Sequence, residues 1–170
     1  GEEGKFVETT NLNPSSLYSS SKASADLIAL SYFHTFKVPV IISRCSNNFG
    51  PYQFIEKLIP LLITNALKNE KLPIYGNGMN IRDWINVIDH CRGIETLLHY
   101  GKPGEIYNFG GNNQFKNIEI AHFILDYLNK PYSMIEYVQD RPGHDLRYAM
   151  DFSKVSRELS WFPMIDFKTS

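Results

Sequence analysis

The chain has 170 residues, enough for one domain with a substantial core, and its net charge at pH 7 is −1. This near-neutral charge argues against nucleic acid or an anionic membrane as a partner, and we expect neither. The apolar runs are too short to span a bilayer, the polar N-terminus does not resemble a signal peptide, and the two cysteines cannot form a disulfide framework. We therefore predict a cytoplasmic protein.

Hydrophobic periodicity and turn residues predict an alternation of helices and strands along the chain. The predicted helices cover about residues 16–36, 54–70, 89–101, 117–130 and 153–161, and the predicted strands cover about 37–45, 72–76, 81–88, 104–111 and 133–139. We expect loops at 46–53 and 140–145, and helix caps at Asp89, Asn117 and Ser153. This alternation predicts an α/β fold with a largely parallel sheet.

The chain opens on a helix and contains no G-x-G-x-x-G turn, whereas a doubly wound sheet normally begins with a strand and such a turn. We therefore expect the back part of a Rossmann-type doubly wound parallel sheet from a larger protein. Elements without their native neighbours should leave apolar surface exposed on the first helix and on residues 38–43.

The first candidate for chemistry is Tyr18, which stands four residues before Lys22 near the start of the first predicted helix. Residues at i and i+4 share one helix face, and a nearby ammonium stabilises a phenolate and lowers its pKa. The pair could therefore take a proton from an alcohol while a hydride leaves the same carbon. The alternative is an ordinary helix start, with the neighbouring serines as capping residues.

The second candidate is the segment from Arg44 to Pro60, which follows a predicted buried strand. Ligands of open α/β sheets bind beyond the carboxyl ends of strands, and the amides of Asn47 and Asn48 can both donate and accept. Lys57 precedes a helix, where a cation gains nothing from the helix dipole, so it is either solvated or held for an anion. The alternative is a plain polar loop.

Cationic side chains form a third candidate. Arg82 lies in an extended segment, and Arg141, His144 and Arg147 follow a predicted strand end in a chain that is otherwise near neutral. Guanidinium groups match phosphate oxygens in pairs, so these residues suit a diphosphate. The alternatives are a surface pair between Arg82 and Asp83 and a charged loop neutralised by its own aspartates.

Metal and thiol chemistry are not indicated. The five histidines are scattered without ligand spacing, so we predict no metal site. Cys45 follows a predicted buried strand and is more typical of a small apolar core residue than of a nucleophile.

The order and spacing of these motifs resemble the dTDP-glucose 4,6-dehydratases, a branch of the extended short-chain dehydrogenases that use tightly bound NAD. The resemblance covers essentially all 170 residues. It is carried, after the Tyr18 and Lys22 pair, by the stretches "CSNNFGPYQFIEKLIP", "LPIYGNGMNIRDWINVIDH", "GEIYNFGGNNQFKNIEI" and "DRPGHDLRYAMD". Sugar epimerases of the same superfamily share the tyrosine and lysine but usually not the other motifs.

The resemblance implies a role for each matching position. Tyr18 would take the proton of the sugar 4-hydroxyl as C4 gives a hydride to NAD, and Lys22 would also hold the nicotinamide ribose. Asn48 would contact the cofactor. The positions expected to bind the nucleotide sugar are Asn47, Lys57, Leu58, Pro73, Ile74, Tyr75, Arg82, Asn117, Arg141 and His144, with residues 73–75 at the thymine and the two arginines at the diphosphate.

The family assigns the acid and base that eliminate water to an Asp-Glu pair, which this sequence does not contain. Glu2 and Glu3 lie after the expected position and are not assigned this role. We therefore expect the chain to hold the oxidation dyad and most of the substrate pocket, and to be inactive alone. The product of the complete reaction would be dTDP-4-keto-6-deoxyglucose.

The resemblance also implies a division of the chain and an assembly. Residues 1–50 and about 84–111 would belong to the Rossmann-type domain, and about 51–83 and 112–170 to a small α/β domain that binds the nucleotide sugar. Family members form homodimers through helices that include the one with the Tyr and Lys. The alternatives are a nucleotide-sugar 4-epimerase or decarboxylase of the same superfamily, or a non-catalytic nucleotide-sugar-binding remnant.

Overall fold

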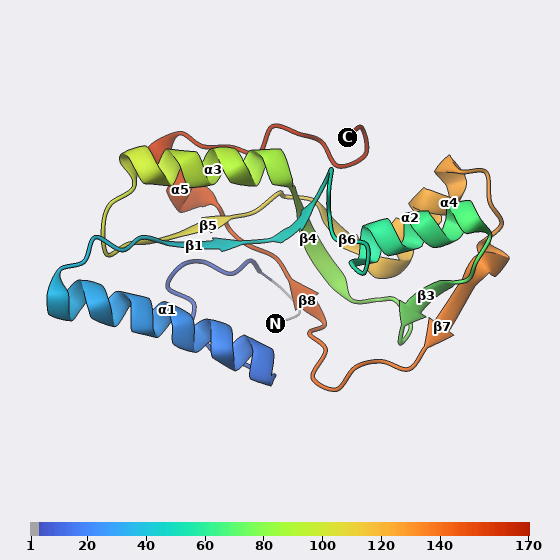
Figure 1. Cartoon of the computed structure of the whole chain (residues 1–170), viewed down its shortest axis with the longest axis horizontal. Helices are drawn as coiled ribbons and strands as arrows, with labels where there is room; N and C mark the ends of the chain where they lie inside the picture. The colour runs from blue at the N-terminus through green and yellow to red at the C-terminus, as the bar shows by residue number, and fades with distance from the viewer. Residues whose placement is uncertain (1–3) are drawn as a thin grey trace.

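The structure is a computed structural model that describes residues 4–170 (Figure 1). Its elements in chain order are α1 (Leu17–Phe36), β1 (Ile42–Cys45), β2 (Asn47–Phe49), α2 (Leu58–Lys68), β3 (Leu72–Tyr75), β4 (Ile81–Asn86), α3 (Val87–Tyr100), β5 (Ile106–Phe109), β6 (Gln114–Lys116), α4 (Asn117–Tyr127), the 3₁₀ turn η1 (Tyr132–Met134), β7 (Ile135–Val138), β8 (Arg147–Tyr148) and α5 (Ser153–Leu159). The pairs β1–β5, β2–β4 and β3–β7 are parallel. The predicted α/β class is confirmed.

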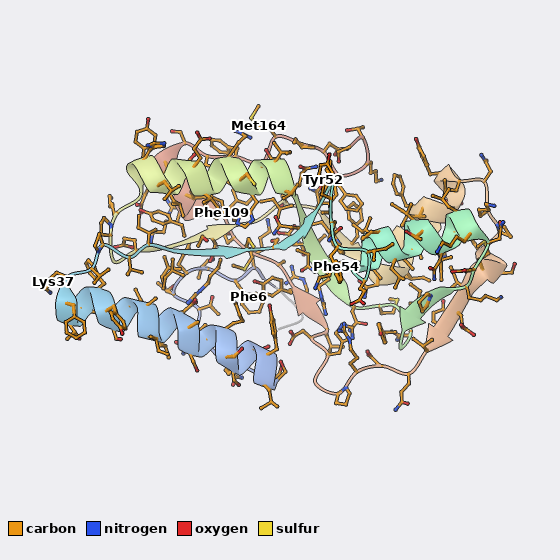
Figure 2. The ribbon with its side chains drawn as sticks, in the orientation of Figure 1. Phe6, Lys37, Tyr52, Phe54, Phe109 and Met164 are labelled. Atoms are coloured by element: carbon orange, nitrogen blue, oxygen red, sulfur yellow. The ribbon has the colours of Figure 1, made fainter. Side chains whose placement is uncertain are left out.

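One hydrophobic core lies around the parallel pair β1–β5. Helices α3 and α5 cover one face of the pair, and α1 runs along the other (Figure 1). Phe109 of β5 is fully buried under α3, and its ring meets Trp161 edge-on with the ring centres 4.8 Å apart (Figure 2). A Cβ on Gly93 would lie 2.4 Å from the Phe109 ring, so α3 can approach the strand only because this residue is glycine.

A second core fills the other end of the molecule, where α2 and α4 pack on the parallel pair β3–β7 (Figure 1). Leu62, Leu72 and Leu125 are fully buried there. Phe167, near the C-terminus, packs its ring on Phe49 with the ring centres 4.7 Å apart. The C-terminal segment therefore closes this core from outside the sheet.

Helix α1 forms as predicted but buries none of its residues. The hydroxyl of Ser16 accepts a hydrogen bond from the Ser19 amide at 3.1 Å and caps the first turn, as the serine-rich sequence indicated. The exposed apolar side chains of this helix include Leu17, Tyr18, Leu27, Ile28, Tyr32 and Phe36. The expected exposure of apolar surface is therefore confirmed for α1.

The contacts between α1 and the rest of the fold include an ion pair and an aromatic contact. The guanidinium of Arg44 in β1 pairs with Asp26 at 2.7 Å, and the ring of Phe33 lies against the backbone of Gly104. In the segment after the helix, Val38 is exposed but Ile42 is buried. The expectation of apolar exposure over 38–43 is therefore wrong for Ile42, whose side chain the fold buries, whereas Ser43 of the same strand is exposed.

Strand β4 joins the two cores. It pairs with β2 in parallel, with β6 in antiparallel and with β8 in parallel orientation, and Arg82 stands opposite both Phe115 and Tyr148. The sequence placed β2 in a loop and did not predict β6 or β8. Each has only two or three residues, too few to show a periodicity, and each is a strand because β4 supplies its hydrogen-bonding partner.

Helix starts differ from the predicted caps by a few residues. Helix α3 is capped by Asn86, whose side-chain oxygen accepts from the Ile88 amide at 2.9 Å, whereas Asp89 lies buried in the first turn. Helices α4 and α5 take Lys116 and Phe152 at the cap position, one residue before the predicted caps. Pro60 lies in the first turn of α2, which needs no amide donor there.

The predicted division into two units stays a prediction. Helix α5 lies within 112–170, but its Val155 packs with Ile85 and Tyr107 in the first core. Within residues 4–170 no helix has the length and apolarity that crossing a bilayer requires, and no group of three or more potential metal-binding side chains occurs there.

The buried carboxylate of Asp89 anchors the C-terminal segment, because it accepts from the amides of Met164 and Ile165, both at 2.8 Å, and pairs with Arg92 at 2.6 Å. We expect Asp89→Ala to lower the free energy of unfolding by about 3 kcal/mol, since two backbone amides and the Arg92 guanidinium lose the buried carboxylate that they contact. Urea unfolding measures this change. The exposed Asp126→Ala serves as the control and should cost less than about 1 kcal/mol. Equal losses in the two variants would contradict the assignment.

Candidate functional site

Tyr75, Arg141 and His144 come together at the end of β3. The guanidinium carbon of Arg141 lies 4.8 Å from the centre of the Tyr75 ring, and His144 meets that ring edge-on with the ring centres 6.4 Å apart. His144 Nδ1 lies 2.6 Å from Asp140 Oδ1. The structure therefore brings the tail of β3 together with the 140–144 loop, which the sequence placed nearly seventy residues away.

Arg82 reaches the same region from β4. Its guanidinium donates at 2.8 Å to the carbonyl oxygens of Ile81 and Asp145. Burial lowers the pKa of Arg82, while the neighbouring Asp145 opposes that shift. Among residues 4–170, neither Arg82 nor Arg141 forms an ion pair with a carboxylate, so both positive charges stay available to an anion.

Asn117 is connected to this cluster through backbone contacts. Its amide donates to the carbonyl of Asn80 at 3.1 Å, and the Asn80 side chain donates to the Asp145 carbonyl at 3.2 Å. The side-chain oxygen of Asn117 is buried and has no hydrogen-bond partner in the described part of the chain. A buried acceptor of this kind normally has a partner, and a bound ligand can supply it.

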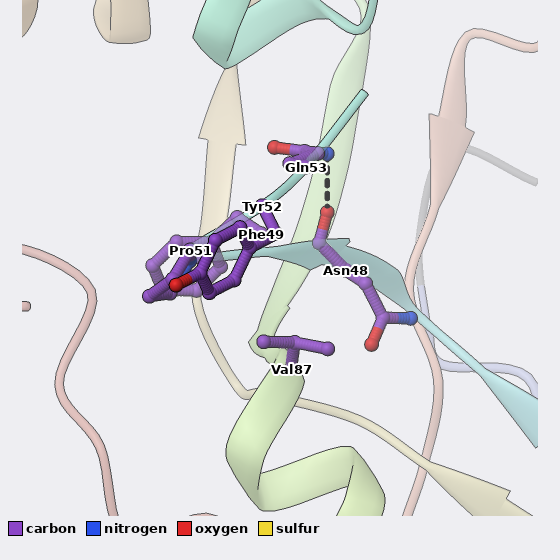
Figure 3. A pocket seen from close by; sticks show the side chains of 7 residues that line it. Asn48, Phe49, Pro51, Tyr52, Gln53 and Val87 are labelled. Atoms are coloured by element: carbon purple, nitrogen blue, oxygen red, sulfur yellow. Dashed lines mark hydrogen bonds between the residues drawn. The ribbon is translucent and has the colours of Figure 1, made fainter. Parts of the chain in front are cut away.

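Asn48 forms the centre of a second group of polar side chains, at the end of β2. Its side-chain nitrogen donates to the Ser46 carbonyl at 3.2 Å and to the Cys45 sulfur at 3.3 Å. The backbone carbonyl oxygen of Asn48 accepts a hydrogen bond from the side-chain nitrogen of Gln53 at 2.8 Å. This bond fixes the loop beside a pocket of about 120 Å³ (Figure 3). Val87 lines the opposite wall of this pocket (Figure 3).

His90 completes this group, and sequence reasoning missed it. Its Nδ1 lies 3.0 Å from Asn48 Oδ1, and burial lowers its pKa. The sequence treated it as one of five scattered histidines. The available signal was its position in the first turn after β4, on the side of the sheet where ligands of α/β proteins bind.

Tyr148 is a second residue that the sequence analysis missed. It lies beside Arg82 in the β4–β8 pairing, and its hydroxyl donates to the Cys45 carbonyl at 3.3 Å. Burial raises the pKa of Tyr148 to about 12, so it stays protonated at neutral pH. Tyr148 therefore bridges the cationic cluster and the end of β1.

Tyr18 and Lys22 lie on one face of α1, at the predicted i and i+4 spacing. Tyr18 is 74% exposed. The two residues are close enough to act electrostatically on the sites described above: burial raises the pKa of Cys45 and the Lys22 charge opposes this shift, while Tyr18 is among the groups that raise the pKa of Tyr148. Their catalytic role stays a prediction.

The remaining predicted residues are less closely grouped. Asn47 is half-buried in β2, Lys57 is exposed at the cap of α2, and Leu58 packs on the second core. Pro73 and Tyr75 show more surface than Ile74, whose side chain is 1% exposed in that core.

Alternation along β3 turns the Ile74 side chain inward, and the expected place of this residue beside a ligand stays a prediction. Only its backbone can face a ligand. Glu2 and Glu3 lie outside the described residues.

The whole chain, residues 1–170, matches the family described as GDP-mannose 4,6 dehydratase. The chain belongs to this family. It is 50% identical to a dTDP-glucose 4,6-dehydratase of Xanthomonas campestris pv. campestris, with 99% of this chain and 50% of that protein covered. It is 52% identical to an Escherichia coli dTDP-glucose 4,6-dehydratase, with 96% of this chain and 47% of that protein covered.

Solved structures show the same likeness and confirm the Rossmann-type fold. The crystal structure of dTDP-glucose 4,6-dehydratase from Bacillus anthracis in complex with NAD superposes with a TM-score of 0.95 at 54% identity, covering 99% of this chain and 53% of that one. A UDP-glucuronic acid 4-epimerase from Bacillus cereus, in complex with UDP-glucuronic acid and NAD, gives 0.93 at 26% identity, covering 98% and 54%. The chain spans about half the length of the relatives it matches.

The lowered pKa of His90 predicts a pH dependence of stability. Because the unfolded chain protonates this ring more readily than the folded chain, the His90 contribution to the free energy of unfolding is full above about pH 6.5 and declines as the pH falls from there towards the lowered pKa. Urea unfolding between about pH 5 and pH 8 measures it, and His90→Asn should show a flatter profile below about pH 6.5 than the unsubstituted chain.

His90→Gln is the control, since it removes the same titrating ring and should flatten the profile equally. Parallel profiles for all three proteins would contradict the prediction.

Proposed function

We propose that the chain forms the substrate-side part of an NAD-dependent lyase that converts dTDP-glucose to dTDP-4-keto-6-deoxyglucose, a step of deoxysugar biosynthesis. The observation that carries the proposal is the convergence of Tyr75, Arg82, Arg141 and His144 from three separate segments of the chain. A dTDP-glucose 4,6-dehydratase from Streptomyces venezuelae, solved with NAD and dTDP bound, supports it with a TM-score of 0.96 at 46% identity, covering 98% of this chain and 52% of that one.

The cationic cluster suits a nucleoside diphosphate. Arg82 and Arg141 form no ion pair with a carboxylate within residues 4–170, and their planar groups can bind phosphate oxygens in pairs. Beside them Tyr75 is 38% exposed, and its ring offers a surface on which a planar base can stack. Asn117 supplies a buried acceptor that has no partner among residues 4–170. We assign this end of β3 to the diphosphate and thymine.

The polar group at the end of β2 suits the cofactor. NAD, when bound, supplies the acceptor for the hydride that leaves C4 of the sugar. Asn48 offers an amide beside a small pocket, where it can contact the nicotinamide end, and Lys22 can hold the ribose. Tyr18 then takes the proton of the sugar 4-hydroxyl.

The exposed apolar side chains of α1 fit a homodimer of the intact enzyme, in which this helix packs on its symmetry mate. The charge pattern and the absence of a bilayer-crossing helix in residues 4–170 fit a protein without a membrane partner.

Binding of dTDP tests the cationic cluster directly. We expect Arg82→Gln and Arg141→Gln each to weaken dTDP binding to the chain by about tenfold or more, because each removes charge-assisted hydrogen bonds to phosphate. Isothermal titration calorimetry measures the affinity. The matched control is Arg157→Gln on the exposed side of α5, which should leave the affinity unchanged. A loss in the control as large as in the other two would assign the binding to net charge instead.

Turnover separates the dehydratase from its alternatives. The chain has no adjacent Asp-Glu pair to eliminate water, so we expect it to release no dTDP-4-keto-6-deoxyglucose from dTDP-glucose and NAD. Chromatography of the sugar nucleotides measures this. Formation of the 4-keto-6-deoxy sugar would overturn the assignment of the missing pair. Conversion of dTDP-glucose to its C4 epimer would favour the epimerase, and tight binding by the intact protein without any turnover would favour a binding module.

A further inference from the structure

The side-chain amide of Asn48 is held in one orientation by what surrounds it. The Ser46 carbonyl oxygen, 3.2 Å away, can only accept a hydrogen bond, so the amide nitrogen of Asn48 must face it. The amide oxygen then faces His90 Nδ1 at 3.0 Å. Because an amide oxygen can only accept, the imidazole must carry its proton on Nδ1.

We propose that His90 is a positioning residue for Asn48: its Nδ1–H donates to the amide oxygen of Asn48 and fixes the direction in which that amide meets a ligand. The proposal rests on the proposed function for the identity of that ligand, the nicotinamide end of NAD. His90 itself touches neither reacting atoms nor substrate in this assignment.

The surroundings of the His90 ring leave Asn48 as the acceptor of its one proton. The ring lies in the first turn of α3 and contacts the buried Phe109 ring, with the ring centres 5.9 Å apart. Its Nε2 is buried and has no partner in the described part of the chain. Burial also lowers the pKa of His90, so the ring is neutral at pH 7 and carries one proton, the one that Asn48 uses.

Without this donor the amide would be poorly held. Its remaining partners are a carbonyl oxygen at 3.2 Å and a sulfur at 3.3 Å, and sulfur is a weak acceptor. The side-chain oxygen of Asn48, which is half-buried in β2, would lose His90 Nδ1 as its hydrogen-bond donor. Rotation about the Cβ–Cγ bond would then exchange the positions of donor and acceptor, and a ligand that needs one of them would bind less tightly.

The first test needs no substitution and no ligand. Long-range ¹H–¹⁵N correlation spectra of the chain at about pH 7.5 report which imidazole nitrogen carries the proton. We expect His90 in the Nδ1–H tautomer, with Nε2 unprotonated. The Nε2–H tautomer would overturn the proposal, because that ring could not donate to Asn48.

The second test compares three substitutions at His90. His90→Asn keeps a donor near the place of Nδ1, His90→Gln moves the donor to the place of Nε2, and His90→Phe removes it. We expect hydrogen exchange of the Asn48 side-chain amide to be within about threefold of the original in His90→Asn and about tenfold faster in the other two. Asn113 is the control, since its amide donates to the carbonyls of Trp84 and Gly111 and should not change.

The third test connects His90 to the cofactor, and it uses a full-length enzyme that contains this chain. NAD affinity should fall about tenfold in His90→Phe and His90→Gln and stay within about threefold in His90→Asn. In an Asn48→Ala background, His90→Phe should cost nothing further, because His90 acts only through Asn48. Equal losses in both backgrounds would show a merely structural role and overturn the proposal.

These measurements separate the two proposals. If the full-length enzyme does not bind NAD, the proposed function fails, and the tautomer and exchange measurements still decide whether His90 positions Asn48. If the enzyme binds NAD but the losses add independently, the role of His90 fails and the proposed function stands.

Discussion

The buried carboxylate of Asp83 is the interaction on which the arrangement of the site depends. Its side chain is almost fully buried in β4 and accepts from the Ser46 hydroxyl, from the Gly111 amide at 3.2 Å and from the Asn113 amide at 2.8 Å. These donors come from the start of β2 and from the turn before β6. A buried carboxylate without donors is very costly, so the burial of Asp83 requires both segments to meet at β4.

Two groups of functional side chains follow from this junction. Asn47 and Asn48 come directly after Ser46, and their direction is set once Ser46 is tied to β4. Arg82 precedes Asp83 and faces the opposite side of the strand, towards the loop that carries Arg141. One strand therefore separates the polar group at the end of β2 from the cationic cluster and fixes the distance between them.

The sequence predicted the elements that carry a clear pattern and failed where a residue's meaning depends on a distant partner. Helix α1, strand β4 and the pairing of Tyr18 with Lys22 on one helix face could be predicted from spacing alone. Asp83 was considered as a surface partner of Arg82, but alternation along a strand sends neighbours to opposite faces, so Asp83 is buried and Arg82 is not paired with it.

The sequence analysis missed His90 and Tyr148, because their partners Asn48 and Cys45 lie 42 and 103 residues away, and the position of His90 after β4 was the one signal it offered for that residue. Ile74 shows how burial limits what a motif residue can do. The resemblance names it as part of a continuous motif, and the strand turns its side chain into the core, so only its backbone can meet a ligand. A motif names positions along the chain, and the pleat of the strand decides which of them a ligand can reach.

The two parts of the candidate site differ in what holds them. The cationic cluster stands on β3, β4 and the 140–145 loop, which backbone and side-chain hydrogen bonds connect to each other within the described residues. Tyr18 and Lys22 stand on a helix without a single buried residue, attached to the sheet through Asp26 and Phe33. The binding of a nucleoside diphosphate can therefore be preformed in this chain, whereas the position of the Tyr18 hydroxyl depends on whatever covers the apolar face of α1.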